Sequence, residues 1–253
     1  MSVTNFRRAS FKKGLPKTSK FADIPAPIPA PTFITTGLFR WYDANNPASY
    51  PGTGTTWTDL QGSGYNMILT NGPTFTAGTP DYFTFDGSND YARADDNDFP
   101  TGTNRTFSMG FWVYNLTTND GGISRVGNRT FNQQIGYFIQ GAGGTYAPSW
   151  FADIYGAALS GPGNNPFTQN VWTNLYFTMN ATGNYVFYTN GVQYATGTND
   201  NLSFGVPSAE GYRIGFSDTY GNFRCAEATA YNITLTPAQV LQNFNAQKTT
   251  YGY

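Results

Sequence analysis

The sequence predicts an all-β protein: a two-sheet antiparallel sandwich with one short C-terminal helix and an extended N-terminal arm. Of the 253 residues only 11% are charged, whereas 17% are aromatic and 29 are glycine. This composition suits pleated strands joined by tight turns, because aromatic side chains pack well on sheets and glycine adopts turn conformations. Apolar and polar residues also alternate over many short segments, as they do in half-buried strands.

The alternation marks individual strands from residue 33 onward. In the segment 106–115, Phe107 and Met109 share one predicted face, and Trp112 and Tyr114 share the other. A dozen short strands without long helical periods favour two packed sheets. Further predicted strands are 82–86, 134–140, 149–155, 174–179, 184–189, 192–196, 212–216 and 223–233.

Turns are predicted where Asn-Gly or Asp-Gly pairs separate these strands, because both residues tolerate a positive φ. The clearest hairpin signal is Asn190-Gly191, which lies between two strand-like segments. Other predicted turns are Asn71-Gly72, Asp86-Gly87 and Asp120-Gly121.

One helix is predicted near the C-terminus. Thr236 can cap it, Pro237 fits its first turn, and Gln239 completes a capping box. We expect this helix to pack on the edge of the sandwich. Its predicted apolar stripe consists of Val240, Leu241 and Phe244.

The first 31 residues differ in composition from the rest, so we divide the chain into an arm, 1–31, and a domain, 32–253. Six of the 14 basic residues precede residue 21, and the remainder of the chain carries a net charge of −7. A cationic segment on an acidic body is predicted to dock onto a negatively charged partner. The predicted anchoring residues are Phe6, Arg7, Arg8, Phe11, Lys12, Lys13, Lys17, Lys20 and Phe21.

Nucleic acid is the alternative partner for this arm, because clustered cations neutralise phosphates. The arm contains no Trp or Tyr among its cations, and its phenylalanines suit grooves on a protein surface. Protein anchoring is therefore the preferred interpretation.

Several reaction classes lack the residues they need. The chain has no histidine, so it cannot form a histidine-based nucleophilic triad, and its single cysteine rules out an intramolecular disulfide. We expect Cys225 to be a small buried apolar residue. No apolar run approaches the roughly 18 residues of a membrane helix, and the N-terminus has no signal-peptide pattern.

Calcium is a possible ligand of the turn after 82–86. Asp86 and Asp90 could supply carboxylate ligands, with Ser88 and Asn89 between them. The spacing does not match an EF-hand, and the alternative is a tight hairpin that uses Asp-Gly for its backbone angles.

Four aromatic residues are predicted to lie on strand faces that point away from the core, where they could contact a glycan or a protein. Exposed aromatic rings stack against sugars, but they can equally fill a second layer or a subunit contact. Packing or protein contact is favoured over sugar stacking. The four residues are Trp112, Tyr114, Trp150 and Tyr188.

An ordered series of motifs spans residues 37–247. It comprises Gly37-Leu38-Phe39-Arg40-Trp41-Tyr42-Asp43-Ala44, Trp57-Thr58-Asp59-Leu60, Phe85-Asp86-Gly87-Ser88-Asn89-Asp90-Tyr91 and Leu235-Thr236-Pro237-Ala238-Gln239-Val240. Together these motifs resemble the laminin-G-like, concanavalin A-like jelly-roll domains of bacteria and bacteriophages. The resemblance implies two curved antiparallel sheets with a closing helix, and binding of glycans or proteins, sometimes with calcium. Domains with this wording of the motifs, in this order, resemble those of phage structural proteins: head decorations, fibres and tail parts.

Some relatives on this fold are glucanases that use clustered glutamates, which work as paired nucleophile and acid. The only glutamates here, Glu210 and Glu227, lie on different predicted segments, and Asp153 has no acidic neighbour in sequence. We therefore predict that the protein is not an enzyme, and keep a hydrolase using Glu227 or Asp153 as an alternative.

The predicted function is that of a virion structural protein, anchored to other capsid or tail proteins by the arm and present in many copies or as a homo-oligomer. The alternative is an adhesin module that binds cell-surface carbohydrate.

Overall fold

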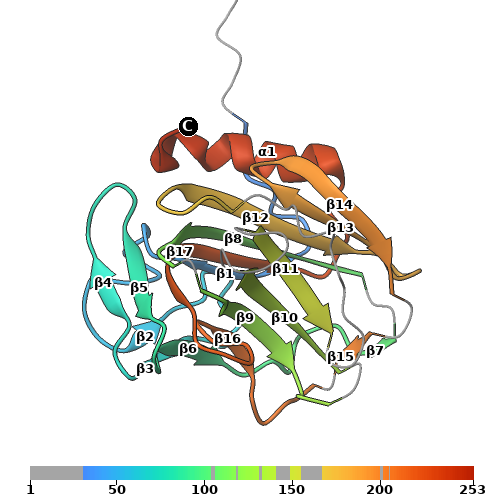
Figure 1. The fold of residues 1–253 in the computed structure, drawn as a ribbon, viewed down its shortest axis with the longest axis horizontal. Coiled ribbons are helices and arrows are strands. Elements are labelled where there is room, and N and C mark those ends of the chain that lie inside the picture. The colour runs from blue at the N-terminus through green and yellow to red at the C-terminus, as the bar shows by residue number, and fades with distance from the viewer. Residues whose placement is uncertain are drawn as a thin grey trace, which may run out of the picture. The chain divides into compact units, whose positions relative to one another are not determined.

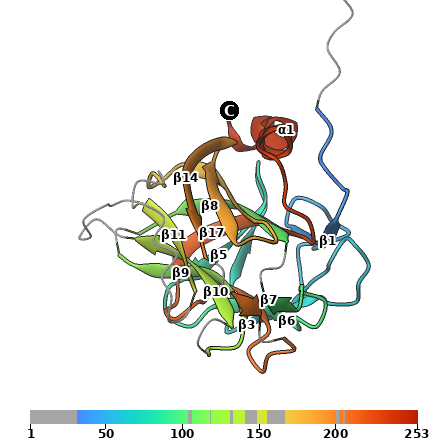
Figure 2. The same cartoon turned by 90° about the vertical axis from the view of Figure 1, so that its right-hand side faces the viewer.

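The computed structural model shows two antiparallel sheets packed face to face, as Figures 1 and 2 show from two sides. The predicted jelly-roll sandwich with one C-terminal helix is thereby confirmed. The residues that the structure describes are 31–103, 106–117, 119–130, 133–140, 149–154, 167–199, 202–204 and 206–253.

One sheet, here called the helix-covered sheet, is built around the two longest strands. In spatial order it contains β14 (Val192–Thr198), β13 (Asn184–Thr189), β12 (Trp172–Met179), β8 (Phe107–Asn115), β17 (Asn222–Tyr231), β5 (Tyr82–Asp86) and β4 (Thr74–Thr76). β1 (Leu38–Asp43) pairs with the second half of β17, beside the stretch that pairs with β5.

The second sheet forms the other layer. Its order is β11 (Ser149–Ile154), β10 (Gln134–Gln140), β9 (Gly121–Gly127), β16 (Tyr212–Ile214), β6 (Tyr91–Ala94), β3 (Met67–Thr70) and β2 (Thr56–Trp57). A separate short pair joins β15 (Ser203–Phe204) to β7 (Gly102–Thr103).

The core between the sheets follows the predicted alternation. Phe107, Met109 and Phe111 of β8 point inward and are almost fully buried. Phe111 meets Tyr137 of the second sheet with ring centroids 5.3 Å apart. The predicted hairpin turn is also present, because Asn190 and Gly191 both have positive φ, 52° and 75°, between β13 and β14.

A β-bulge in β17 changes which of its residues face the core. The register with β8 shifts between Cys225 and Glu227. Before the shift Cys225 lies in the core, and after it Ala228 does, so the inward parity changes from odd to even numbers. The bulge therefore turns Glu227 toward the outer face of the sheet. Cys225, which precedes the bulge, is buried in the core as predicted.

The C-terminal helix lies across the outer face of the helix-covered sheet (Figure 1). It consists of α1 (Pro237–Gln247) and a final 3-10 turn, η1 (Lys248–Tyr251). Thr236 and Gln239 form the predicted capping box, in which each side chain bonds the other's backbone. Among the described residues, no helix is long and apolar enough to span a bilayer.

The predicted apolar stripe of α1 is partly wrong. Val240 and Phe244 are buried, but Leu241 is 44% exposed. Asn243 is buried instead, because its side chain bonds the hydroxyls of Tyr176 and Tyr231 on the sheet beneath, at 3.0 Å each. A polar residue thus takes part in the packed side of this helix, and apolar periodicity could not reveal it.

Aromatic stacking holds the final turn onto the sheet. The rings of Trp112 and Tyr251 are 3.8 Å apart at their centroids and nearly parallel. The Trp112 indole donates a hydrogen bond of 2.9 Å to Gln247, and the Gln247 amide donates in turn to Glu227. This contact closes the outer face of the sheet from β8 to β17.

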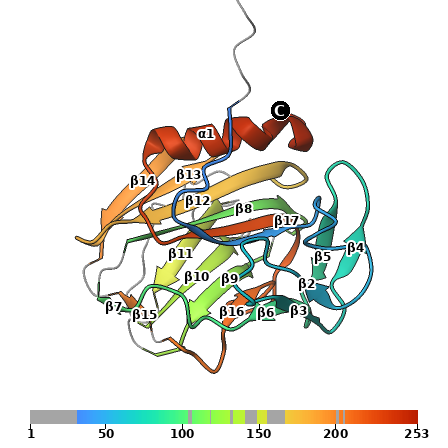
Figure 3. The ribbon, with the colours of Figure 1, turned by 180° about the vertical axis from the view of Figure 1, so that it is seen from behind.

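The segment that leads into β1 is fixed against the same helix, as Figure 3 shows from behind. The Ile34 backbone N–H donates to Asn243 at 2.8 Å, and Gln242 donates to the carbonyl of Thr32 at 2.7 Å. Phe33 stacks on Trp41 of β1 with centroids 5.4 Å apart. Residues 32–34 therefore have a defined position on the sandwich.

If the C-terminal segment is part of the folding unit, Trp112→Ala will lower the free energy of unfolding by about 3–5 kcal/mol, because it removes a fully buried aromatic side chain. Chemical denaturation of both proteins measures this. Ile68→Ala, at a side chain that is 49% exposed, serves as the control and should change stability by less than about 0.5 kcal/mol. Equal small effects at both positions would contradict a closed outer face.

Candidate functional site

Three of the four aromatic residues lie on the face predicted for them, and packing, the favoured interpretation, covers them. Trp112 and Tyr188 do lie on the face that points away from the core, but they are 0% and 1% exposed. The C-terminal helix and the residues beside it cover that face. Tyr114 is half-buried, packed edge-on against Trp172 and beneath Arg224. None of these rings offers an open platform for a sugar.

Trp150 lies in the core, so the face predicted for it is wrong. Its indole N–H donates a 3.0 Å hydrogen bond to the hydroxyl of Thr189 on the facing sheet. Its ring packs edge-on against Phe187 at 5.0 Å. Because a buried indole needs a hydrogen-bond partner, this contact accounts for a tryptophan between the two sheets.

The turn predicted to hold calcium uses its two carboxylates mainly for its own backbone. Asp86 accepts hydrogen bonds from the N–H groups of Ser88 and Asn89, at 2.8 and 3.3 Å. Asp90 is buried and accepts from the N–H of Asp86 at 3.3 Å. Asp90 therefore faces inward, and only Asp86 reaches the surface hollow described below.

The pKa values of these two aspartates shift in opposite directions. The Ser88 backbone N–H lowers the pKa of Asp86, because it stabilises the ionised carboxylate. Burial raises the pKa of Asp90, and the nearby charge of Asp86 adds to the effect. These shifts follow from turn geometry.

The other acids of this stretch are bound to neighbouring groups. Asp98 pairs with the buried Arg40, which also donates to the carbonyl of Tyr65 at 2.8 Å. Asp96 accepts the N–H of Ser208 at 2.8 Å. No cluster of three or more metal-binding acids or thiols occurs among the described residues.

The structure does not bring together the acids named for a hydrolase. Glu227 lies beneath the C-terminal helix on the helix-covered sheet, and Asp153 lies on β11 of the second sheet. Burial raises the pKa of Glu227 well above its ordinary value, and the charge of Asp43 on the paired strand adds to this. Glu210 forms ion pairs with Arg125 and Arg213, at 2.8 and 2.6 Å.

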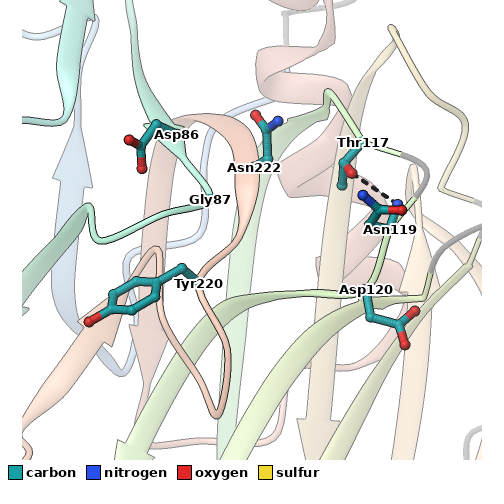
Figure 4. A pocket seen from close by; sticks show the side chains of 7 residues that line it. All are labelled: Asp86, Gly87, Thr117, Asn119, Asp120, Tyr220 and Asn222. Atoms are coloured by element: carbon teal, nitrogen blue, oxygen red, sulfur yellow. Dashed lines mark hydrogen bonds between the residues drawn. The ribbon is translucent and has the colours of Figure 1, made fainter.

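A polar hollow of about 250 Å³ opens at one end of the sandwich, and we call it the rim pocket (Figure 4). Three chain segments meet there: the turn after β5, the loop between β8 and β9, and the approach to β17. Asp86 and Tyr220 lie on one side of it in Figure 4, and Asn119 and Asp120 lie on the other. Its lining residues are Asp86, Gly87, Thr117, Asn119, Asp120, Tyr220 and Asn222.

Close backbone approach shapes this pocket. Gly87 has a φ of +77°, and a Cβ there would lie 2.9 Å from the Cβ of Asn222. A Cβ on Gly121 would lie 3.0 Å from the Cα of Gly221. Side chains at these glycines would push the three segments apart, so glycine is required for the loops to converge.

Several polar groups in the rim pocket are available to a ligand. Within the described part of the chain, the Tyr220 hydroxyl and the side-chain amides of Asn119 and Asn222 form no hydrogen bond. Asp86 and Asp120 also line the pocket, and the ring of Tyr220, which packs against Phe216 with centroids 4.8 Å apart, borders it. Amides, carboxylates and one ring suit a hydroxyl-rich ligand, and the oxygens are of the kind that calcium accepts.

Sequence reasoning missed most of this pocket. Asp86 was a predicted ligand residue and Asp120-Gly121 a predicted turn, but Asn119, Tyr220 and Asn222 carried no signal of their own. All three lie in or next to polar loops that contain glycine. Only the fold shows that these loops meet at the same end. The predicted anchoring residues of the arm lie outside the described residues.

Comparison with protein families identifies the fold's relatives. Residues 86–241 match the model of the laminin G-like family described as the concanavalin A-like lectin/glucanases superfamily. The chain belongs to this superfamily. The match extends from the first acid of the rim pocket into the C-terminal helix. No curated protein matches the chain.

Solved structures share the fold at low sequence identity. The chain resembles Trypanosoma rangeli sialidase in complex with the inhibitor DANA, with a TM-score of 0.62 and 17% identity over 86% of this chain and 34% of that one. It thus spans about a third of the sialidase. The chain also resembles domain 4 of an extracellular arabinanase from Geobacillus stearothermophilus, in complex with arabinotriose. The TM-score is 0.56 and the sequence identity is 18%, over 81% of this chain and 97% of the domain.

A third structure that the chain resembles is the receptor binding domain of botulinum neurotoxin D. Its TM-score is 0.55 at 12% identity, over 83% of this chain and 53% of that one. At such identities these likenesses establish the sandwich alone.

The buried carboxyl of Glu227 predicts a pH dependence of stability. Because its pKa is raised in the folded state, ionisation disfavours folding as pH rises above the ordinary value of 4.5. Glu227→Gln mimics the protonated form, so its stability relative to wild type should increase between pH 4 and pH 8, by at least about 1 kcal/mol. Urea denaturation at both pH values measures the change. A stability difference independent of pH would contradict this assignment.

Proposed function

We propose that this protein is a lectin-like display protein: the sandwich binds a glycan at the rim pocket, and the arm, 1–31, attaches it to a virion. The observation that carries the glycan site is the rim pocket itself. It brings amide, hydroxyl and carboxylate side chains from three chain segments together in one surface hollow. That combination is what recognition of a polyhydroxylated ligand requires.

Two further facts support a glycan at this position. The outer face of the helix-covered sheet is closed by α1 and η1, so its aromatic rings are unavailable for stacking. The arabinanase domain that resembles this chain along nearly its whole length was solved in complex with arabinotriose. We extend this by analogy to a saccharide ligand here, in a pocket defined by this chain's own residues.

We also propose that binding occurs without turnover. A glycosidase needs a protonated acid beside the bond to be cleaved and a second carboxylate near it. In the rim pocket the pKa of Asp86 is lowered by the turn N–H groups, which makes it a poor proton donor. Glu227 lies beneath the helix and cannot reach the pocket's ligand.

Attachment to a virion is the second part of the proposal, and it rests on the separation of charge. The arm holds six basic residues and the rest of the chain carries a net −7. Residues 32–34, where the arm ends, are fixed to the helix α1. This arrangement suits a tether: the arm would bind other virion proteins and hold the folded domain close to them.

The rim-pocket assignment predicts that the purified full-length protein binds a defined set of saccharides on a glycan array, tested with calcium and with a chelator. Tyr220→Ala and Asn119→Ala should each weaken binding by about 10-fold, because each loss of about 1.4 kcal/mol changes affinity tenfold. Ile68→Ala removes a 49% exposed side chain outside both the pocket and the C-terminal segment, and it should leave binding unchanged.

Two outcomes would count against this site. If no saccharide binds in either condition, the glycan proposal fails. If a saccharide binds and Tyr220→Ala retains wild-type affinity with a wild-type melting temperature, the ligand occupies another surface.

The anchoring role predicts that neutralising the six arm cations, by changing Arg7, Arg8, Lys12, Lys13, Lys17 and Lys20 to Gln in the full chain, abolishes incorporation into particles. The melting temperature of this six-residue variant should match that of the wild-type protein. Quantitative detection of the protein in purified particles measures the effect, and normal incorporation of this variant would refute electrostatic anchoring.

A further inference from the structure

Exposed apolar side chains of the described residues gather at one corner of the sandwich. Ile68, on the second sheet, is the exception among the six large ones. The other five surround the hairpin turn of Asn190 and Gly191. They are Val171, Val192, Tyr194, Leu241 and Tyr253.

We call these five residues the corner patch, because contacts around the turn link the segments that carry them. The Asn190 amide donates to the Tyr253 hydroxyl at 3.0 Å, and that hydroxyl donates to the carbonyl of Trp172 at 2.6 Å, beside Val171. A Cβ on Gly191 would lie 2.9 Å from the Leu241 side chain. The patch therefore joins β12, β14, α1 and the C-terminal residues.

Long stretches of the chain around the corner patch carry no charge, and the cation beside it is Lys248, whose ammonium lies 5.8 Å from the centre of the Phe244 ring. Residues 154–199, which include β12, β13 and β14, contain no Asp, Glu, Lys or Arg. Neither do residues 228–247, which include α1. The chain beyond residue 20 has a net charge of −7, so two of these folded bodies meet with least charge repulsion at such an uncharged surface.

An open strand edge runs through the same patch. β14 is the last strand of the helix-covered sheet and pairs with β13 on one side only, among the strands that the structure describes. Natural edge strands are usually protected by Lys, Pro, charge or a β-bulge, and of these β14 has only a bulge. A bulge near Tyr194 is its one irregularity, and Ala195–Thr198 keep regular pairing beyond it.

We propose that β14 is a homodimerisation edge, at which β14 of a second copy pairs antiparallel across a two-fold axis. Antiparallel pairing of a strand with itself is self-complementary, so both open edges and both corner patches are covered at once. The helix-covered sheets of the two copies then form one continuous sheet. This inference does not depend on the glycan or virion proposals.

The geometry of such a dimer has a consequence for the arm. A two-fold axis perpendicular to the joined sheets keeps both α1 helices on the same side of it. Residues 32–34 lie against α1, so they leave the two copies on that same side. Two arms could then attach to one surface, which raises the effective concentration of the second arm after the first has bound.

Sedimentation equilibrium of the full-length protein from about 1 to 100 μM tests the proposal. Wild type should form a dimer, and Tyr194→Lys should weaken it by at least about 10-fold, because two buried positive charges would face each other across the axis. Val192→Lys is a second variant with the same expected effect. Ile68→Lys is the matched control, since Ile68 and Tyr194 are both 49% exposed, and it should dimerise as wild type does.

Strand pairing itself is tested by single cysteines at Gln193, Tyr194 and Thr196. The native Cys225 is fully buried, so a disulfide between copies reports the introduced thiol. Oxidation should cross-link at one or two of these positions and not at Ile68→Cys. A monomer throughout the concentration range, or a dimer that both lysine variants at β14 leave intact, would overturn the proposal.

Discussion

The packing of the C-terminal segment on the outer face of one sheet determines which surfaces of this molecule can act. Trp112 stacks on Tyr251 at 3.8 Å and bonds Gln247, whose amide bonds Glu227. These contacts turn one sheet face that is rich in aromatic residues into interior. They also bury the carboxyl of Glu227. A three-layer arrangement of helix, sheet and sheet results.

The surfaces proposed to bind a ligand or a partner therefore lie at one end and one edge of the sandwich. At one end, three glycine-containing loops form the rim pocket, where polar side chains and a tyrosine ring face solvent. At one edge, β14 and the turn before it present an uncharged apolar surface. The first suits a small hydroxyl-rich ligand and the second suits a protein, so the two proposals concern different surfaces of one scaffold. Neither requires a reactive side chain.

Local patterns predicted the fold and much of its detail. Period-two alternation located β8 and its inward face, the Asn190-Gly191 pair located a hairpin, and the capping box of Thr236 began the helix. These signals are local because strand faces, turn angles and caps depend on near neighbours. The site was different. Whether Trp112 is exposed depends on a helix more than a hundred residues later, and the pocket depends on loops that converge only in the folded chain.

The most direct test of the closed outer face is native-state hydrogen exchange of the Trp112 indole N–H, followed by NMR. This N–H is buried and bonded to Gln247, so its exchange should require the C-terminal segment to leave the sheet. The account predicts exchange as slow as that of core amides in β8 and β17, with an opening free energy near that of global unfolding. Fast exchange of this indole while those amides stay protected would show that the outer face is open.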